Sequence, residues 1–365
     1  MPALRRLAPV IGLFLLAPFV GEFLLGNLTL ESAIIGVILA PMYGGGAVLV
    51  RELARRYGGG WPTIALLACA YALIEEGPLD QLLWNESYPG VDSFRSASYV
   101  PALGTSVELI QTVVALHAVW SICVPIALIE TFVPDRRTKP WLGRAGLLVV
   151  ATIFALGAAF VFWGNYSEYH FIGPAIPQLL IGMLIVGLVI AAFGIRSQRL
   201  PALDSRAPSP WLVGAAALAA TSAYWMTSGL RASAWSEWVG IAVWCLVAGG
   251  GATMISRWSR QQGWDARHRF ALAAGATLTY VWLAFPMPPV DGGSLTVDLV
   301  SNVVFGGIAV IVLVAAGYRL FDGPRLEKQT HPQGDNADGD ADPQRRMKPR
   351  NCALPDNRSG PGESE

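Results

Sequence analysis

The sequence predicts an all-α protein, a polytopic bundle of membrane-spanning helices. Only 14% of the 365 residues are charged and 53% are hydrophobic, whereas about 25% of the residues in a soluble domain are charged. Apolar stretches recur along residues 1–320 at the length of about 20 residues that crosses a bilayer. The basic residues fall in every second connection between these stretches, as the positive-inside rule requires.

Ten apolar segments are predicted to be transmembrane helices. They cover residues 7–26, 33–50, 61–83, 107–133, 143–163, 175–195, 210–229, 235–255, 270–287 and 299–319. Arg5 and Arg6 before the first segment resemble the start of a signal peptide. However, the apolar run continues to Leu25, and no small-residue cleavage site stands out. We therefore expect the first segment to remain as an uncleaved helix.

The distribution of arginine and lysine predicts the orientation of the chain. Apart from Arg95 and Arg231, the connections hold their basic residues after the second, fourth, sixth and eighth segments. These residues are Arg51, Arg55, Arg56, Arg136, Arg137, Lys139, Arg144, Arg196, Arg199, Arg206, Arg257, Arg260, Arg267 and Arg269. One missed helix would invert this alternation downstream, so it supports about ten spans with both termini in the cytoplasm. The many Ala, Gly and Arg and the few Lys favour a bacterial plasma (inner) membrane.

Residues 321–365 differ in composition from the rest of the chain. Asp, Gly, Pro, Arg and Asn dominate there, and apolar residues are almost absent. Such a segment cannot bury enough apolar surface to offset the entropy of ordering it. The sequence thus predicts a transmembrane domain over residues 1–320 followed by a disordered cytoplasmic tail. The predicted partner is the lipid bilayer, and the formal net charge of zero does not favour a nucleic acid.

Two adjacent carboxylates, Glu75 and Glu76, interrupt the third segment. A charged side chain near the bilayer centre costs roughly 2.5–3.5 kcal/mol on insertion scales, so such residues are usually functional or paired. Glu75 lies about 21 Å along a helix that starts at Trp61, which places the pair in the outer half of the membrane. Asp80 is one turn beyond Glu76, after a helix break at Gly77-Pro78.

The fourth segment brings a histidine to a comparable depth. His117 lies about 15 Å from the outer end of this segment, and Ser121 follows one turn later on the same face. Glu108 begins the same segment, and Glu22 lies near the outer end of the first. We expect a cavity in the outer half of the bilayer to be lined by Glu22, Glu75, Glu76, Asp80, Glu108 and His117. A histidine beside carboxylates can exchange protons near neutral pH.

His170 is the second histidine that could join these carboxylates. It stands in the outer connection before the sixth segment, whereas His268 and His331 fall on the cytoplasmic side. The alternative is an interfacial histidine that is hydrogen-bonded to water. The histidines and carboxylates lack a recognised metal-ligand spacing, so the sequence identifies neither a metal nor a cofactor.

The order of these residues resembles the CPBP (Abi, CAAX-protease-like) family of intramembrane proteases. The family has a Glu-Glu pair with an Arg four residues later, a His four residues after a Phe, and a His followed four residues later by Asn or Asp. Glu75-Glu76 correspond to the first motif, His117 to the second and His170 to the third. The resemblance covers residues 61–175 at most.

Each of these motifs departs from the family pattern at one position. Asp80 replaces the Arg, Val113 replaces the Phe, and Pro174 replaces the Asn or Asp. The resemblance implies that one glutamate activates a water for attack on a peptide bond, while the histidines position this water or stabilise the oxyanion.

Three functions remain open at this point, and the sequence does not decide whether the protein is an enzyme. The cluster of acids with histidine, together with the resemblance, indicates an intramembrane hydrolase that acts on a membrane peptide. Ten spans, a broken helix and protonatable acids equally indicate a proton-coupled transporter of a small molecule. The third alternative is a non-catalytic scaffold or lipid-interacting protein in which the acids have a structural role.

Overall fold

The structure is a computed structural model that describes residues 2–88, 96–195, 201–228, 234–290 and 292–321. Within these ranges the regular structure is helical apart from four short strands, which confirms the all-α part of the predicted fold class. The predicted disordered tail, residues 321–365, lies outside the described residues except for Phe321, which ends the last helix.

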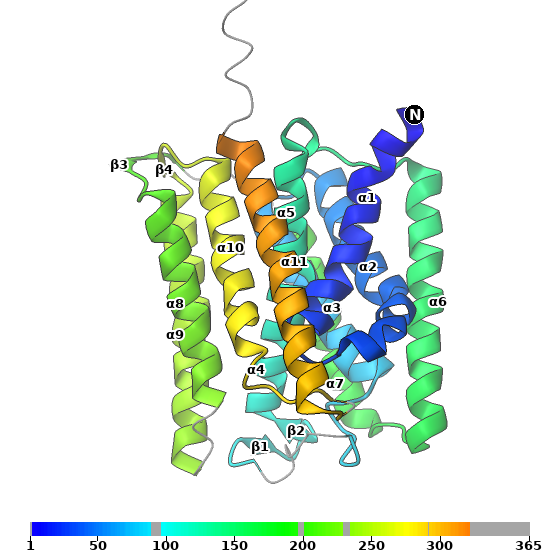
Figure 1. The fold of residues 1–365 in the computed structure, drawn as a ribbon. Helices are drawn as coiled ribbons and strands as arrows, with labels where there is room; N and C mark the ends of the chain where they lie inside the picture. The colour runs from blue at the N-terminus through cyan, green and yellow to red at the C-terminus, as the bar shows by residue number, and fades with distance from the viewer. Residues whose placement is uncertain (1, 89–95, 196–200, 229–233, 291, 322–365) are drawn as a thin grey trace, which may run out of the picture. The chain divides into compact units, whose positions relative to one another are not determined.

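Every predicted apolar segment corresponds to one helix or to a run of consecutive helices (Figure 1). The α-helices are α1 (Pro2–Pro18), α2 (Ala33–Arg56), α3 (Trp61–Ile74), α4 (Val107–Ala115), α5 (Val124–Phe132), α6 (Arg144–Tyr169), α7 (Ala175–Gly194), α8 (Pro210–Ser228), α9 (Ala234–Trp258), α10 (Ala266–Leu283) and α11 (Leu295–Phe321). Among the described residues, seven helical stretches are long and apolar enough to cross a membrane. They are Arg6–Phe23, Leu30–Arg56, Val107–Phe132, Arg144–Tyr169, Ala175–Gly194, Trp235–Trp258 and Leu295–Phe321.

Shorter elements join or extend these helices. Three π-helical segments, η1 (Phe19–Phe23), η3 (Glu75–Leu79) and η5 (Leu116–Cys123), continue α1, α3 and α4 respectively. Two 3₁₀ turns, η2 (Leu30–Ser32) and η6 (Pro134–Arg136), lie before α2 and after α5. The strands β1 (Tyr99–Val100) and β2 (Thr105–Ser106) pair antiparallel, and β3 (Leu203–Arg206) and β4 (Gln261–Gln262) pair parallel.

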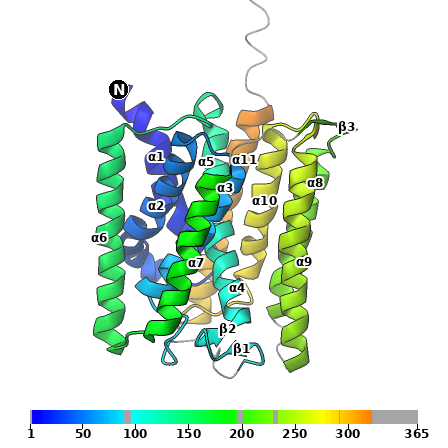
Figure 2. The ribbon, with the colours of Figure 1, turned by 180° about the vertical axis from the view of Figure 1, so that it is seen from behind.

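The described helices pack around four apolar clusters, of which two are large. In the first, α2 contacts α1 and α6, and α3 contacts α7 and η5 (Figures 1 and 2). In the second, α10 packs on α8, α5 and α11, with Trp120 of η5 stacked on Tyr280 of α10 at 4.5 Å between ring centroids. Since η5 contributes side chains to both large clusters, it lies in the interior of the helical bundle.

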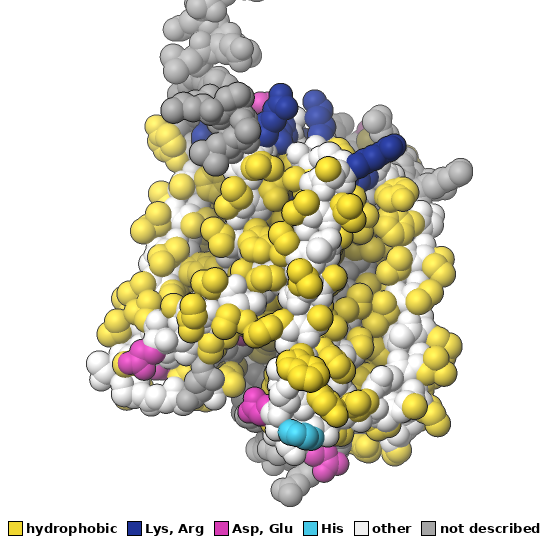
Figure 3. All heavy atoms as spheres, turned by 90° about the vertical axis from the view of Figure 1, so that its right-hand side faces the viewer, with side chains coloured by type: hydrophobic (Ala, Val, Ile, Leu, Met, Phe, Trp, Pro, Cys, Tyr) yellow, Lys and Arg dark blue, Asp and Glu magenta, His cyan; other side chains and the backbone are white. Residues whose placement is uncertain are grey.

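The outward surface of the helices is apolar. Large side chains such as Leu148, Phe160, Leu179 and Ile190 are exposed on α6 and α7. On the face in Figure 3, hydrophobic side chains cover the middle, while Lys and Arg side chains gather at one end. An apolar surface of this extent is unfavourable in water and suits contact with lipid. The structure is thus compatible with an integral membrane protein.

A buried ion network holds the C-terminal end of α2. Glu130 of α5 accepts hydrogen bonds from Arg51 Nε at 3.1 Å and from Arg55 Nη2 at 2.8 Å. The Arg51 guanidinium also pairs with Glu52 at 2.7 Å, and neither side chain is exposed. The alternation of basic residues predicts that Arg51 and Arg55 belong to a cytoplasmic connection. Because these charges are buried, they are unfavourable unless they are paired.

The same guanidinium fixes the connection between α5 and α6. It stacks on the Trp141 ring, 3.3 Å from the ring centroid. Its Nη2 donates to three backbone carbonyl oxygens, at 2.9–3.2 Å, of Arg136, Arg137 and Lys139. Arg51 is therefore a common hydrogen-bond donor for three carbonyl oxygens of this connection, and Trp141 Nε1 also donates to that of Arg136.

Gly44-Gly45-Gly46 allows α2 to approach three neighbouring helices. A Cβ at Gly44 would lie 2.1 Å from the Phe14 carbonyl oxygen of α1, and one at Gly46 would lie 2.2 Å from the Tyr71 ring of α3. Because the Phe14 contact is with backbone, α1 and α2 would have to separate. We expect Gly44→Ala to lower the free energy of unfolding in detergent by about 1–3 kcal/mol.

Gly182→Ala on α7 is the matched control for this prediction. A Cβ at Gly182 meets no atom within 4 Å, and alanine favours a helix over glycine by about 0.8–1.0 kcal/mol. This variant should therefore be as stable as the wild type or more so in the same thermal unfolding measurement. Equal stability of both variants would contradict the close packing of α1 against α2.

Candidate functional site

His117 lies between the two adjacent glutamates. Its Nε2 forms a hydrogen bond with Glu76 Oε1, and its Nδ1 lies 3.1 Å from Glu75 Oε2. His117 and Glu75 are each 2% exposed and Glu76 is 5% exposed. Only the doubly protonated imidazolium can donate from both nitrogens to the two carboxylates. The arrangement thus suits an exchange of protons between His117 and either glutamate.

Hydroxyl and aromatic groups enclose the imidazole. Ser121 Oγ is 3.3 Å from His117 Nδ1. The Tyr43 and Tyr71 ring centroids lie 5.7 and 6.5 Å from that of His117, and Tyr71 interacts electrostatically with Glu75. Side chains from α2, α3 and η5 therefore surround the histidine.

Glu22 of η1 joins this group through Tyr43. The Tyr43 hydroxyl donates to Glu22 Oε1, and Asn27 Nδ2 donates to Oε2 of the same carboxylate at 3.1 Å. Glu22 also interacts electrostatically with His117 and Glu75. The first helix therefore brings a third carboxyl group to the site, as its position in the sequence predicts.

Asp80 adds a fourth carboxyl group at the end of η3. It interacts with Glu76 within hydrogen-bonding reach, and its Oδ1 accepts a hydrogen bond from the Leu82 N–H at 3.0 Å. Two carboxyl groups this close are compatible when they share a proton. We call the group formed by Glu22, Tyr43, Tyr71, Glu75, Glu76, Asp80, His117 and Ser121 the acid–histidine cluster.

The acid–histidine cluster contains more acidic groups than cations. It holds four carboxyl groups and one imidazole, and within the described ranges no Lys or Arg side chain forms an ion pair with any of the four. An unpaired buried carboxylate costs several kcal/mol in an apolar environment. Bound protons are therefore needed to balance the charge of this cluster.

All three π-helical segments of the described chain carry members of the cluster. Glu22 lies in η1, Glu75 and Glu76 lie in η3, and His117 and Ser121 lie in η5. A π-segment widens the helix by one residue, loosens its hydrogen bonding, and occurs frequently at functional sites. In η3 the distortion coincides with Pro78, which cannot donate a backbone hydrogen bond.

The structure does not bring His170 into the cluster. Helix α6 continues to Tyr169, and His170 ends it in the left-handed conformation at φ 50°. The side chain is exposed and stacks on Tyr166 at 6.0 Å between ring centroids. Gln81, two residues after η3, accepts a hydrogen bond from the Gly173 N–H and so contacts the segment that follows His170. The expectation that His170 joins the carboxylates is therefore corrected: its side chain is exposed and lies outside the cluster.

Glu108 also lies apart from the cluster. It lines an open hollow of about 330 Å³ between α4, α8 and α9, together with Gln111 and Glu237. Glu108 lies in the first turn of α4, more than two helical turns before His117. This part of α4 lies at the end of the bundle where β1 and β2 are found (Figure 1). Of the residues expected to line one cavity, the structure thus brings Glu22, Glu75, Glu76, Asp80 and His117 together in the acid–histidine cluster, but not Glu108.

Two tyrosines of the cluster were not predicted from the sequence. Tyr71 precedes Glu75 by four residues, so helical periodicity alone indicates that they share a face. Tyr43 stands beside the glycine triplet of α2, where close packing of helices was to be expected. Tyrosine is common near membrane interfaces. The presence of a tyrosine in these segments therefore did not by itself indicate a functional site.

Neither a metal site nor a related protein identifies the chemistry of the cluster. Across the part of the chain that the structure describes, no group of three or more His, Cys, Asp or Glu side chains is arranged to hold a metal ion. Comparison of the chain with family models, curated proteins and solved structures gives no match.

Proposed function

We propose that the protein spans the plasma (inner) membrane of a bacterium ten times, with both ends of residues 1–320 on the cytoplasmic side. Besides the seven apolar stretches, α3, α8 and α10 run alongside the other helices with 14, 19 and 18 residues (Figures 1 and 2). The start of α1 and the end of α11 lie at the same end of the bundle (Figure 1). That end carries the Lys and Arg side chains in Figure 3, which supports a cytoplasmic assignment.

We infer that the protein is a proton-coupled transporter of a small molecule, with the acid–histidine cluster as its proton-binding site. One observation carries this inference: His117 is buried between Glu75 and Glu76 in a cluster with more carboxyl groups than cations. Ionisable residues within a membrane typically mark proton or ion pathways. A proton can enter and leave such a cluster through hydrogen bonds, without space for a larger ligand.

The contacts define a short path for the proton. His117 exchanges a proton with Glu76 through Nε2 and with Glu75 through Nδ1. Asp80 extends the path beyond Glu76, and Tyr43 and Glu22 border it on the side of α1. A change in the number of bound protons changes the charge of the cluster, and this favours different packings of the π-segments around it.

An intramembrane hydrolase is the second candidate. The observation in its favour is the contact of His117 with Glu76, which joins the residues that correspond to the first two motifs of the CPBP resemblance. Hydrolysis of a peptide bond also requires room for a water and a substrate. The reacting groups are almost completely buried, and His170, the third residue of the resemblance, is exposed elsewhere. Transport therefore ranks first.

The two candidates can be separated in proteoliposomes. Vesicles with the purified full chain are loaded with a small-molecule extract of bacterial cells, and a pH gradient is imposed. Mass spectrometry then measures the loss of each compound, with and without a protonophore. We expect at least one compound to move only when the gradient is present. A mixture of synthetic transmembrane peptides in the same vesicles tests for hydrolysis.

The outcome for each candidate is distinct. Cleavage of a peptide that is lost in Glu75→Gln or Glu76→Gln, without gradient-driven movement, would replace transport by hydrolysis. If no compound moves and no peptide is cleaved in the wild type, the structural alternative, a scaffold or lipid-interacting protein, gains support. In that case the Glu75→Gln and Glu76→Gln variants should mainly lose stability.

A further inference from the structure

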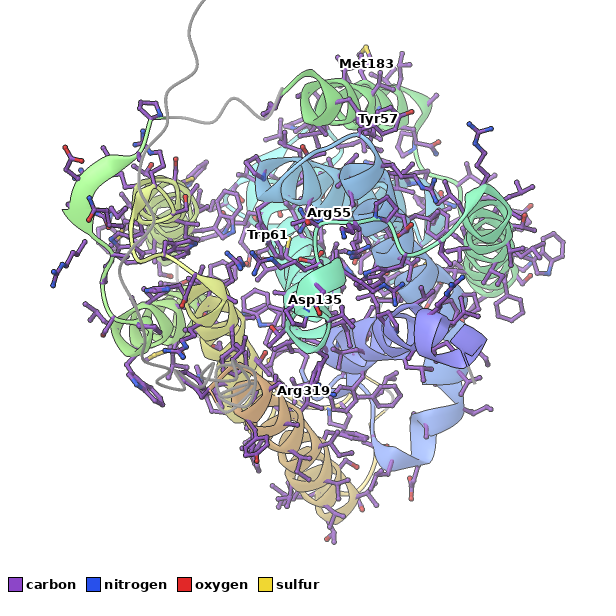
Figure 4. The ribbon with its side chains drawn as sticks, turned by 90° about the horizontal axis from the view of Figure 1, so that it is seen from above. Arg55, Tyr57, Trp61, Asp135, Met183 and Arg319 are labelled. Atoms are coloured by element: carbon purple, nitrogen blue, oxygen red, sulfur yellow. The ribbon has the colours of Figure 1, made fainter. Side chains whose placement is uncertain are left out.

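A second polar site lies at the Arg-rich end of the bundle, away from the acid–histidine cluster. An open hollow is formed between the start of α3, the end of α5, the start of α10 and the end of α11. Its polar lining comes from Glu130, Thr131, Arg137 and Arg269, and Trp61 forms an apolar wall. Figure 4 looks onto this end and shows Trp61 next to Arg55.

Among the described residues that line the hollow, Glu130 carries the one carboxylate, and its charge is already neutralised. Both oxygens of Glu130 accept hydrogen bonds from guanidinium groups, Oε1 from Arg51 and Arg55 and Oε2 from Arg55. The nearby Asp265 accepts from the Arg267 N–H at 2.9 Å and pairs with His268 at 2.9 Å. Both acids attract Arg269 electrostatically, but each already has other partners, so two guanidinium groups line the hollow beside one paired carboxylate.

Arg137 and Arg269 thus carry excess positive charge. They repel each other electrostatically, and Arg55 adds to the repulsion at Arg269. The Nη2 atom of Arg269 is buried and has no hydrogen-bond partner among the described residues. A buried guanidinium N–H without an acceptor costs free energy. A ligand with anionic oxygens would remove both the repulsion and the missing hydrogen bond.

We propose that this hollow binds a phosphate group through Arg137 and Arg269. Guanidinium forks match the geometry of phosphate oxygens and form strong charge-assisted hydrogen bonds with them. The Thr131 hydroxyl and the Trp61 ring border the same space. Basic pockets between membrane helices at the cytoplasmic side bind anionic lipid headgroups. The phosphate therefore comes either from such a headgroup or from a free phosphate ion.

The test measures binding to the purified full chain in an uncharged detergent at fixed ionic strength. Isothermal titration calorimetry follows two probes, dioctanoyl phosphatidylglycerol and inorganic phosphate. We expect at least one of them to bind the wild type about tenfold or more tightly than the Arg269→Gln variant, which corresponds to one lost charge-assisted hydrogen bond. Arg137→Gln should weaken binding to a similar extent. This variant carries the test if Arg269→Gln does not fold.

Arg257→Gln is the matched control, because it removes the same charge from an exposed arginine of α9 outside the hollow. It should bind both probes like the wild type. Binding of phosphatidylglycerol alone identifies the headgroup of a lipid, and binding of inorganic phosphate identifies the free ion. Equal affinity of the wild type and of both hollow variants for both probes would overturn the proposal. An equal loss in Arg257→Gln would overturn it as well.

Discussion

Replacement of Arg51 by methionine is expected to lower the free energy of unfolding by about 3–5 kcal/mol, the cost of breaking a buried ion pair from one side. The variant leaves Glu52 without its closest cationic partner and removes one of the two arginines bound to Glu130. It also leaves three carbonyl oxygens between α5 and α6 without their common donor. Thermal or SDS-induced unfolding of the detergent-solubilised protein measures the loss.

Arg319→Met controls for the loss of a positive charge. Arg319 is exposed in the last turn of α11, at the same end of the bundle (Figure 4). Surface substitutions of this kind usually change stability by less than about 0.5 kcal/mol. A change of similar size in both variants would show that the network around Arg51 contributes no more than a surface charge.

Replacement of Glu76 by glutamine is expected to reduce gradient-driven transport to the level of protein-free vesicles. Glutamine keeps the shape of the side chain and can still form a hydrogen bond with His117, but it cannot bind and release a proton. We therefore expect the folded helical structure to persist while coupling is lost. Flux in proteoliposomes and circular dichroism of the same preparation measure the two properties.

Glu168→Gln is the matched control for this variant. Glu168 is exposed at the end of α6 and lies outside the acid–histidine cluster. Its replacement should leave the flux at the wild-type rate. Wild-type flux in Glu76→Gln would contradict the role of the cluster in coupling. So would an equal loss in Glu168→Gln, because the effect would then follow from net charge alone.

The helices were predictable from the sequence because the length of an apolar run is a local property. The residues at which the helices begin and end were harder to predict. Helix α2 extends beyond the predicted segment to Arg56, since the ion network buries Arg51 and Arg55. Helix α10 begins at Ala266, earlier than predicted, because Asp265 and His268 form a capping box. Both differences arise from side-chain partners that hydropathy does not include.

The association of the glutamate pair with His117 was predictable from the sequence, but the detail of the site was not. Helix rise placed the glutamate pair and His117 in the same half of the membrane, and the structure brings them into contact. The π-segments could not be predicted, because the shift in hydrogen bonding depends on packing against other helices. His170 was misplaced since one residue at a helix end, in a left-handed conformation, decides where its side chain lies.

Infrared difference spectroscopy of the purified protein, recorded as the pH is stepped in H₂O and D₂O, tests most directly whether the acid–histidine cluster binds a proton. The absorption of protonated carboxyl groups is separate from that of carboxylates. We expect a carboxyl band that titrates in the wild type and in Glu168→Gln but is lost or altered in Glu76→Gln. A spectrum without a titrating carboxyl band, or the same band in Glu76→Gln, would contradict a proton-binding cluster.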